Sequence, residues 1–173
     1  MMNKFLLASF VFVCLLACKD DVTPSIKKPE WSKAHSVGYH QEVNEREQIN
    51  IALFLEQHPE LQMTETETGL RYMIYSTKSN KETALSGQKV KVVLSIKLLD
   101  GTTCYTTAKD SEEFIVDKSD VESGLNEAVK LMRVGDKAKL ILPSHLALGV
   151  VGDQDQIPPL AILYIDIELL EIN

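Results

Sequence analysis

The side chains that most often carry catalysis or bind metals are few in this chain and are scattered along it. No histidine stands near a second ligand type at the spacing that a zinc site requires. Cys104 has no neighbouring histidine in the sequence that would activate its thiol. We therefore predict no metal, no cofactor and no acid–base or nucleophilic pair. The four histidines, expected at the surface, are His35, His40, His58 and His145.

The charge of the chain argues against one class of partner. The sequence has 18 basic and 25 acidic residues, which gives a formal net charge of -7. Proteins that bind nucleic acid neutralise its phosphates with clustered lysine and arginine. No basic stripe occurs in the sequence, so we expect no nucleic acid among the partners.

The first residues have the pattern of a bacterial secretion signal. Lys4 precedes an apolar run over 5–17, which is shorter than the ~20 residues of a membrane-spanning helix. The run ends in Leu15-Leu16-Ala17-Cys18, which resembles the lipobox of bacterial lipoproteins. We predict a signal peptide over 1–17 and a lipid on Cys18. An ordinary secretory signal with an incidental cysteine is the alternative.

A lipid anchor would determine where the protein works. Two or more acyl chains hold a protein on a bilayer without spanning it, so we expect a cell-envelope location on the outer membrane. Lys19-Asp20-Asp21 is similar to a signal that sends some Bacteroidetes lipoproteins to the cell surface, and a solvated charged tether explains it equally well. The sequence leaves the periplasmic face and the cell surface open.

Two segments follow the predicted anchor. Residues 18–43 mix prolines, lysines and hydroxyl side chains without a sustained apolar period, and we interpret them as a tether. An N-terminal helical segment over 44–61 comes next. Asn44 is its predicted N-cap, because a side-chain oxygen there accepts a free backbone N–H, and Pro59 ends the helix.

The apolar side of this predicted helix needs a cover. Ile49, Leu53 and Phe54 recur at helical spacing and form a broad apolar face. Either the following domain or a second copy of the chain can bury that face. A homodimeric chaperone paired through these helices is accordingly one hypothesis.

Beyond residue 69 the apolar period changes from that of a helix to that of a strand. Between Lys89 and Leu98 apolar and more polar residues alternate, which predicts a half-buried strand. Asp100-Gly101 predicts a hairpin turn. One short helix, with Ser123 as its cap and Gly135 at its end, lies before the last alternating segments. These features predict an α+β fold in which one helix covers an antiparallel sheet.

The C-terminal part carries a set of spaced landmarks. The long strand ends in Leu99-Asp100-Gly101, and Ile157-Pro158-Pro159 precedes a last strand with Asp166-x-Glu168-Leu169-Leu170. The remaining landmarks are Val121-x-x-Gly124, Met132-x-x-Gly135-x-Lys137-x-x-Leu140, Pro143, Gly149 and Gly152. Together they make residues 66–173 resemble the FKBP-type peptidyl-prolyl cis-trans isomerases, including lipoprotein members of Bacteroidetes. The resemblance implies a curved antiparallel sheet wrapped around one short α-helix.

The resemblance also implies a reaction that needs few special groups. Rotation about an X-Pro bond faces a barrier of ~18–20 kcal/mol because amide resonance is lost in the twisted state. A dry apolar pocket favours that less polar state, while hydrogen bonds hold the flanking peptide. The implied substrates are proline-containing peptides or client proteins, and the implied role is assistance to protein folding.

Ten positions of the family's substrate groove align with residues of this chain. Phe114, Val121 and Ile157 keep the family residue. The positions that differ, most of them aliphatic here, are Leu94, Cys104, Tyr105, Glu122, Leu125, Leu148 and Ile165. Tyr105 replaces an acid that binds ligands, whereas the backbone N–H at position 122 is retained. Two hypotheses follow: an isomerase with a degenerate groove, or a catalytically silent peptide- or protein-binding module.

Overall fold

The computed structural model describes residues 33–77, 82–107 and 110–173. Ser36–Asn173 form one compact unit. The predicted signal peptide, the predicted lipidation site Cys18 and most of the predicted tether lie outside the described residues. In the described ranges, no helix has both the length and the apolar character that a bilayer crossing requires.

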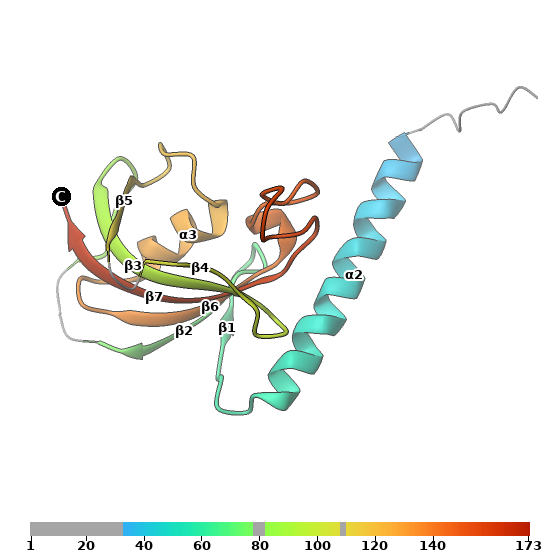
Figure 1. Ribbon diagram of the computed structural model, residues 1–173, viewed down its shortest axis with the longest axis horizontal. Coiled ribbons are helices and arrows are strands. Elements are labelled where there is room, and N and C mark those ends of the chain that lie inside the picture. The colour runs from blue at the N-terminus through green and yellow to red at the C-terminus, as the bar shows by residue number, and fades with distance from the viewer. Residues whose placement is uncertain (1–32, 78–81, 108–109) are drawn as a thin grey trace, which may run out of the picture. The chain divides into compact units, whose positions relative to one another are not determined.

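The described strands form one antiparallel sheet in the order β1-β2-β6-β7-β3-β4, and β5 also pairs with β3 (Figure 1). The strands are β1 Thr64–Glu65, β2 Arg71–Ser76, β3 Lys89–Leu98, β4 Thr103–Thr106, β5 Glu112–Ile115, β6 Lys137–Leu142 and β7 Leu163–Ile172. The helices are α2 Lys33–Gln57, α3 Ser123–Leu131 and the short 3-10 helix η2 Ser144–Leu146. The predicted class, a curved antiparallel sheet around one short helix with an N-terminal helical part, is confirmed.

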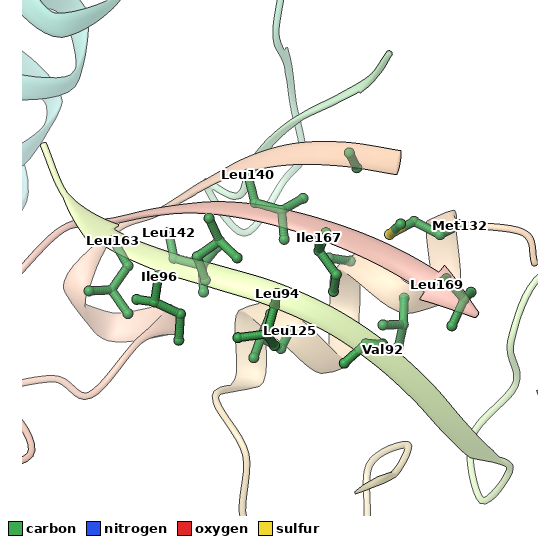
Figure 2. Packing of buried hydrophobic residues seen from close by; sticks show 14 of the residues in the cluster. Val92, Leu94, Ile96, Leu125, Met132, Leu140, Leu142, Leu163, Ile167 and Leu169 are labelled. Carbon is green, nitrogen blue, oxygen red and sulfur yellow. The ribbon is translucent and has the colours of Figure 1, made fainter. Parts of the chain in front are cut away.

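The core lies between the sheet and α3. In β3, alternate residues from Val90 to Ile96 are buried, because successive side chains of a strand point to opposite faces. Figure 2 shows residues of β3, β6 and β7 pointing toward Leu125 of α3 and Met132 just beyond it. The alternation in the sequence therefore identifies the inward face of the sheet correctly.

The limits of α3 differ from the prediction. Glu122 is the N-cap residue, no side chain caps the helix, and Ser123 is its first residue. The Ser123 hydroxyl instead points to the carbonyl oxygen of Leu146, at 3.4 Å. The helix ends at Leu131, and Gly135 occupies the turn that follows, with φ of 88°. The predicted N-cap was wrong because this hydroxyl has a partner on another element.

Helix α2 begins at Lys33, well before the predicted N-cap Asn44. The segment between Pro29 and Pro59 contains no proline, so nothing interrupts the helix there. The predicted tether therefore extends too far, and the predicted helix starts too late. Residues 36–42 are exposed, so the first turns of α2 carry no apolar period that would have revealed them.

The second half of α2 packs against the outward side of the sheet. Ile51 is fully buried against Ile141 and Ile162, and the Phe54 ring lies 5.4 Å from that of Tyr164. The other two residues of the predicted pairing face, Ile49 and Leu53, are 60% and 50% exposed. The domain thus covers only part of that face, and Phe54 belongs to the covered part.

Strand β7 lies in the middle of the sheet, between β6 and β3. Asp166 and Glu168 therefore lie on a strand that is paired on both sides. Lys139 lies 2.8 Å from Asp166, and Lys137 lies 2.9 Å from Glu168, each across the β6–β7 pair. These two acids therefore have lysine partners within the sheet.

Candidate functional site

A hollow of about 300 Å³ lies between β3, β4, the start of α3 and the loop before β7. We call it the groove. Its floor is apolar: Leu94, Ile96, Leu125 and Ile157 are each 3–6% exposed. The groove is lined by Leu94, Ile96, Cys104, Tyr105, Glu112, Glu122, Leu125, Leu148, Asp153, Asp155, Gln156 and Ile157.

Strand β3 positions the floor. Leu94 and Ile96 lie two residues apart, so both point to the inward face of the sheet. Thr107 holds the neighbouring chain against β3: its hydroxyl accepts the Leu94 N–H at 2.8 Å and donates to the Leu94 carbonyl at 3.3 Å. This contact fixes the place where the chain leaves β4, and with it one wall of the groove.

The opposite wall is a tightly folded loop. Gly152 has φ of 67°, and a Cβ atom there would lie 2.2 Å from the carbonyl oxygen of Ile157. Only glycine allows the two chain segments to approach so closely. Asp153 Oδ1 accepts the N–H groups of Asp155 at 2.9 Å and Ile157 at 2.7 Å. These bonds lower the pKa of Asp153 and help to hold Ile157 at the floor.

Four carboxylates surround this apolar floor: Glu112, Glu122, Asp153 and Asp155. Among the described residues that line the groove, none is lysine, arginine or histidine. Among the described residues, none of the four acids forms an ion pair with a base. Burial, and next the nearby Glu112 carboxylate, raise the pKa of Glu122. The groove is therefore apolar at its base and negative at its rim.

Cys104 contributes to the base of the groove as a neutral thiol. Its side chain is close to the carbonyl oxygens of Gln156, at 3.7 Å, and Thr102, at 3.8 Å. Burial, and then the Asp153 carboxylate, raise the pKa of Cys104. A thiol needs a depressed pKa to act as a nucleophile near neutral pH. In the described residues, no cluster of metal-ligating side chains occurs either.

The structure brings most of the predicted groove residues together. Leu94, Cys104, Tyr105, Glu122, Leu125, Leu148 and Ile157 all line the groove.

Phe114, Val121 and Ile165 were predicted for the groove but do not line it. Phe114 pairs with Val90 across β5 and β3, and both side chains are buried in the core. Ile165 is fully buried in the central strand β7, and Val121 packs partly buried against the same core. These three residues therefore belong to the core on which the groove floor packs.

Sequence reasoning missed five lining residues. Ile96 is in phase with Leu94 on β3, and that spacing was a usable signal. Glu112 and the loop residues Asp153, Asp155 and Gln156 have no such period. Their position depends on the fold of the loop and on the pairing of β5 with β3.

Two other hollows lie along α2. One of about 440 Å³ is lined by α2, the β3–β4 turn and Leu160–Ile162, and one of about 420 Å³ by α2 and residues near η2. Both are larger than the groove, but neither contains a residue that the sequence predicted for substrate binding.

The groove lies within a recognisable family domain. The family model for FKBP-type peptidyl-prolyl cis-trans isomerase matches residues 80–170, which is more than half of the chain. The chain therefore belongs to the FKBP-type peptidyl-prolyl cis-trans isomerase family.

The chain is 35% identical over 107 residues to the FKBP-type 22 kDa peptidyl-prolyl cis-trans isomerase of Escherichia coli, a match that covers 62% of this chain and 52% of that protein. It is 32% identical over 106 residues to the Macrophage infectivity potentiator of Trypanosoma cruzi, covering 61% and 54%. The chain thus spans about half the length of these relatives.

A crystal structure of a peptidyl-prolyl cis-trans isomerase from Pseudomonas syringae shares the fold. The TM-score is 0.65 at 23% sequence identity, and the match covers 77% of this chain and 95% of that chain. The FKBP-like fold that the sequence landmarks implied is confirmed.

Proposed function

We infer that this protein is a peptidyl-prolyl cis-trans isomerase whose substrates bind in the groove. The observation that carries the proposal is the apolar hollow of about 300 Å³ at the position that the sequence landmarks indicate. Cis/trans rotation at proline requires loss of amide resonance, and this needs a dry environment more than it needs an acid or base. Family membership supports the same reaction.

Each wall of the groove has a part in this proposal. The proline ring lies on Leu94, Leu125 and Ile157, which exclude water from the rotating bond. The backbone N–H of Glu122 donates a hydrogen bond to a substrate carbonyl. Most of the aligned replacements are aliphatic, so the ring has fewer aromatic contacts than the family pattern provides, each worth ~0.5–1.5 kcal/mol beyond area. We therefore expect a slower isomerase than its relatives.

The acidic rim favours particular peptides. A lysine or arginine next to the proline gains attraction from Glu112 and Asp155, which have no cationic partner among the described residues. Acidic neighbours are repelled. Exposed charge pairs contribute ~0.2–1 kcal/mol each, so the preference is modest and decreases with salt.

A protease-coupled assay on the purified chain tests the reaction. Peptides of the form Ala-Xaa-Pro-Phe with a chromogenic leaving group report cis-to-trans conversion, and the uncatalysed rate is the control. We expect turnover above that rate, blocked by a competing proline peptide. A rate equal to buffer rejects the isomerase. Peptide binding detected by NMR in that case establishes the silent binding module instead.

We also propose that Cys18 carries a lipid that anchors the protein to the cell envelope, in the outer membrane. The support is the sequence Leu15-Leu16-Ala17-Cys18 after an apolar run. Radiolabelled palmitate should enter the wild-type protein in a bacterial host and not the Cys18→Ala variant. Equal labelling of both, or none of either, rejects the lipoprotein.

A further inference from the structure

Helix α2 places a buried carboxylate against the domain. Glu47 is 4% exposed, and both oxygens of its carboxylate accept hydrogen bonds from Ser144. Oε2 accepts the Ser144 N–H at 3.0 Å, and Oε1 accepts the Ser144 hydroxyl at 2.5 Å. A carboxylate buried in this way is costly unless its hydrogen bonds are strong and fixed. The contact therefore holds Ser144 in one position.

Ser144 is the first residue of η2, and it controls the direction of the chain that follows. Its carbonyl oxygen accepts the N–H of Ala147 at 3.0 Å and that of Gly149 at 2.9 Å. Leu148 lies between these two bonded residues and lines the groove. Fixing Ser144 thus fixes the turn that presents Leu148.

The other end of η2 is fitted against α3. The Ser123 hydroxyl lies 3.4 Å from the Leu146 carbonyl oxygen. A Cβ atom at Gly124 would lie 2.6 Å from the Leu142 side chain and 3.0 Å from the same carbonyl oxygen. Glu122 and Leu125, on either side of these two residues, line the groove. Helix η2 is therefore held between α2 and α3, whose first turn lines the groove.

The contact with Glu47 is separable from the attachment of α2. Ile51 is fully buried against Ile141 and Ile162, and Gln48 accepts a hydrogen bond from Arg71 at 2.6 Å. These contacts hold the helix on the sheet without Glu47. The hollow of about 420 Å³ beside Glu47 is also lined by Gly149 and leaves space into which the η2 turn can shift.

We propose that Glu47 is a positioning residue of the isomerase site. It acts through Ser144 to set the Leu148 wall of the groove, although it lies outside both the groove and the family-matched residues 80–170. The inference rests on the proposed function of the groove. Through Glu47, helix α2 then helps to shape the peptide-binding site in addition to packing on the sheet.

Kinetics of matched variants test this role. Glu47→Ala removes both bonds, whereas Glu47→Gln keeps them, because its amide oxygen accepts the Ser144 N–H and its NH₂ group donates to the hydroxyl. We expect Glu47→Ala to raise the KM for a proline peptide by roughly threefold to tenfold with little change in kcat, as a displaced binding wall would. Glu47→Gln should restore the KM. Glu56→Ala, at an exposed position of α2, is the control and should match the wild type.

NMR provides a second measurement if Glu47→Ala folds poorly. Ser144→Ala removes only the hydroxyl bond and should raise the KM less than Glu47→Ala does. Its amide hydrogen exchange should increase at Gly149 and not in β7.

Three outcomes overturn the proposal: a wild-type KM in a folded Glu47→Ala, the same KM rise in Glu56→Ala, or no rescue by Glu47→Gln. An inactive wild-type protein instead refutes the proposed function, and peptide titration by NMR then tests the same wall through the dissociation constant.

Discussion

Carboxylates on the two sides of the sheet have opposite surroundings. On the outward side, Asp166 and Glu168 each face a lysine of β6 at hydrogen-bonding distance. On the inward side, four acids line the rim of the groove, and none of the described lining residues is a base. The outward acids are neutralised by the fold itself. The rim acids have negative charge that the described residues leave unpaired, so a ligand can use it.

A substitution in the apolar floor beneath the rim acids should have the largest effect on stability and activity. Leu125→Ala removes apolar contacts of the groove and leaves a cavity, and such truncations cost ~2–5 kcal/mol of unfolding free energy. We expect kcat/KM to fall roughly tenfold as well, since a buried leucine is worth ~1.5–3 kcal/mol. Denaturant melts and the coupled assay measure the two quantities.

Leu169→Ala is the matched control for that change. Leu169 is fully buried and lies near Val92, away from the groove residues in Figure 2. It should lose comparable stability and keep wild-type kcat/KM at a temperature where both variants are folded. Equal kinetic losses in the two variants would show that the floor acts only through stability.

The charge comparison itself predicts a substrate preference. Peptides with lysine before the proline should have a higher kcat/KM than those with glutamate, and the ratio should fall ~1.4- to 5-fold for each rim charge removed. Glu112→Gln and Asp155→Asn are the test variants, and Glu168→Gln on the outward side is the control. A ratio that does not respond to salt or to the rim variants would show that the rim acids do not meet the substrate.

On the outward side, loss of a charge should affect stability alone. Lys139 lies 2.8 Å from Asp166 and 5.4 Å from the ring centroids of Tyr75 and Tyr164. Burial is the largest single influence and opposes the charge, but the hydrogen bonds and Coulombic attraction to Asp166 and Tyr164 together outweigh it and raise the pKa of Lys139. Lys139→Met should therefore lose at most ~1 kcal/mol near pH 8, with kcat/KM unchanged.

The stability lost in Lys139→Met should depend on pH in a defined direction. A lysine whose pKa is raised by folding stabilises the native state below its ordinary pKa of 10.5. That stabilisation is lost as the pH rises through the folded value. The difference between the wild type and Lys139→Met should be smaller in melts at pH 11 than at pH 8, and a difference that grew with pH would contradict this assignment.

The substitution Glu122→Gln should change stability least, and it should raise stability, whereas Lys139→Met lowers it. Its pKa is raised above 4.5, so the native state loses stability as the pH rises through the interval between 4.5 and the folded value. Glu122→Gln should raise the unfolding temperature slightly at pH 7 and not at pH 4. Glu113→Gln is the control: Lys89 lowers the pKa of Glu113, so this variant should lose stability at pH 7.

The sequence could predict those parts of the fold in which apolar residues recur at a regular local period. The alternation in β3 follows from burial of one face, and it located Leu94 and the core correctly. The start of α2 could not be found in this way, because residues 36–42 are all exposed. A helix is recognised from its pattern only where packing imposes one.

The groove was predictable in its floor and at Glu122 of its rim, but not at the other three rim acids. Leu125 and Ile157 lie in segments with family landmarks, so their alignment was sufficient. Phe114 was misplaced because its burial is decided by the pairing of β5 with Val90. Asp153 and Asp155 line the groove because of loop bonds that no sequence period encodes.

The close approach at Gly152 also constrains how this protein can vary. Every substitution at that codon that changes the amino acid adds a Cβ atom 2.2 Å from a backbone oxygen, which no side chain of the loop can relieve by moving. The neighbouring position 151 is exposed and can change freely. Sequence drift should therefore accumulate around this glycine while it stays fixed, and a homologue that lacks it should have a different loop.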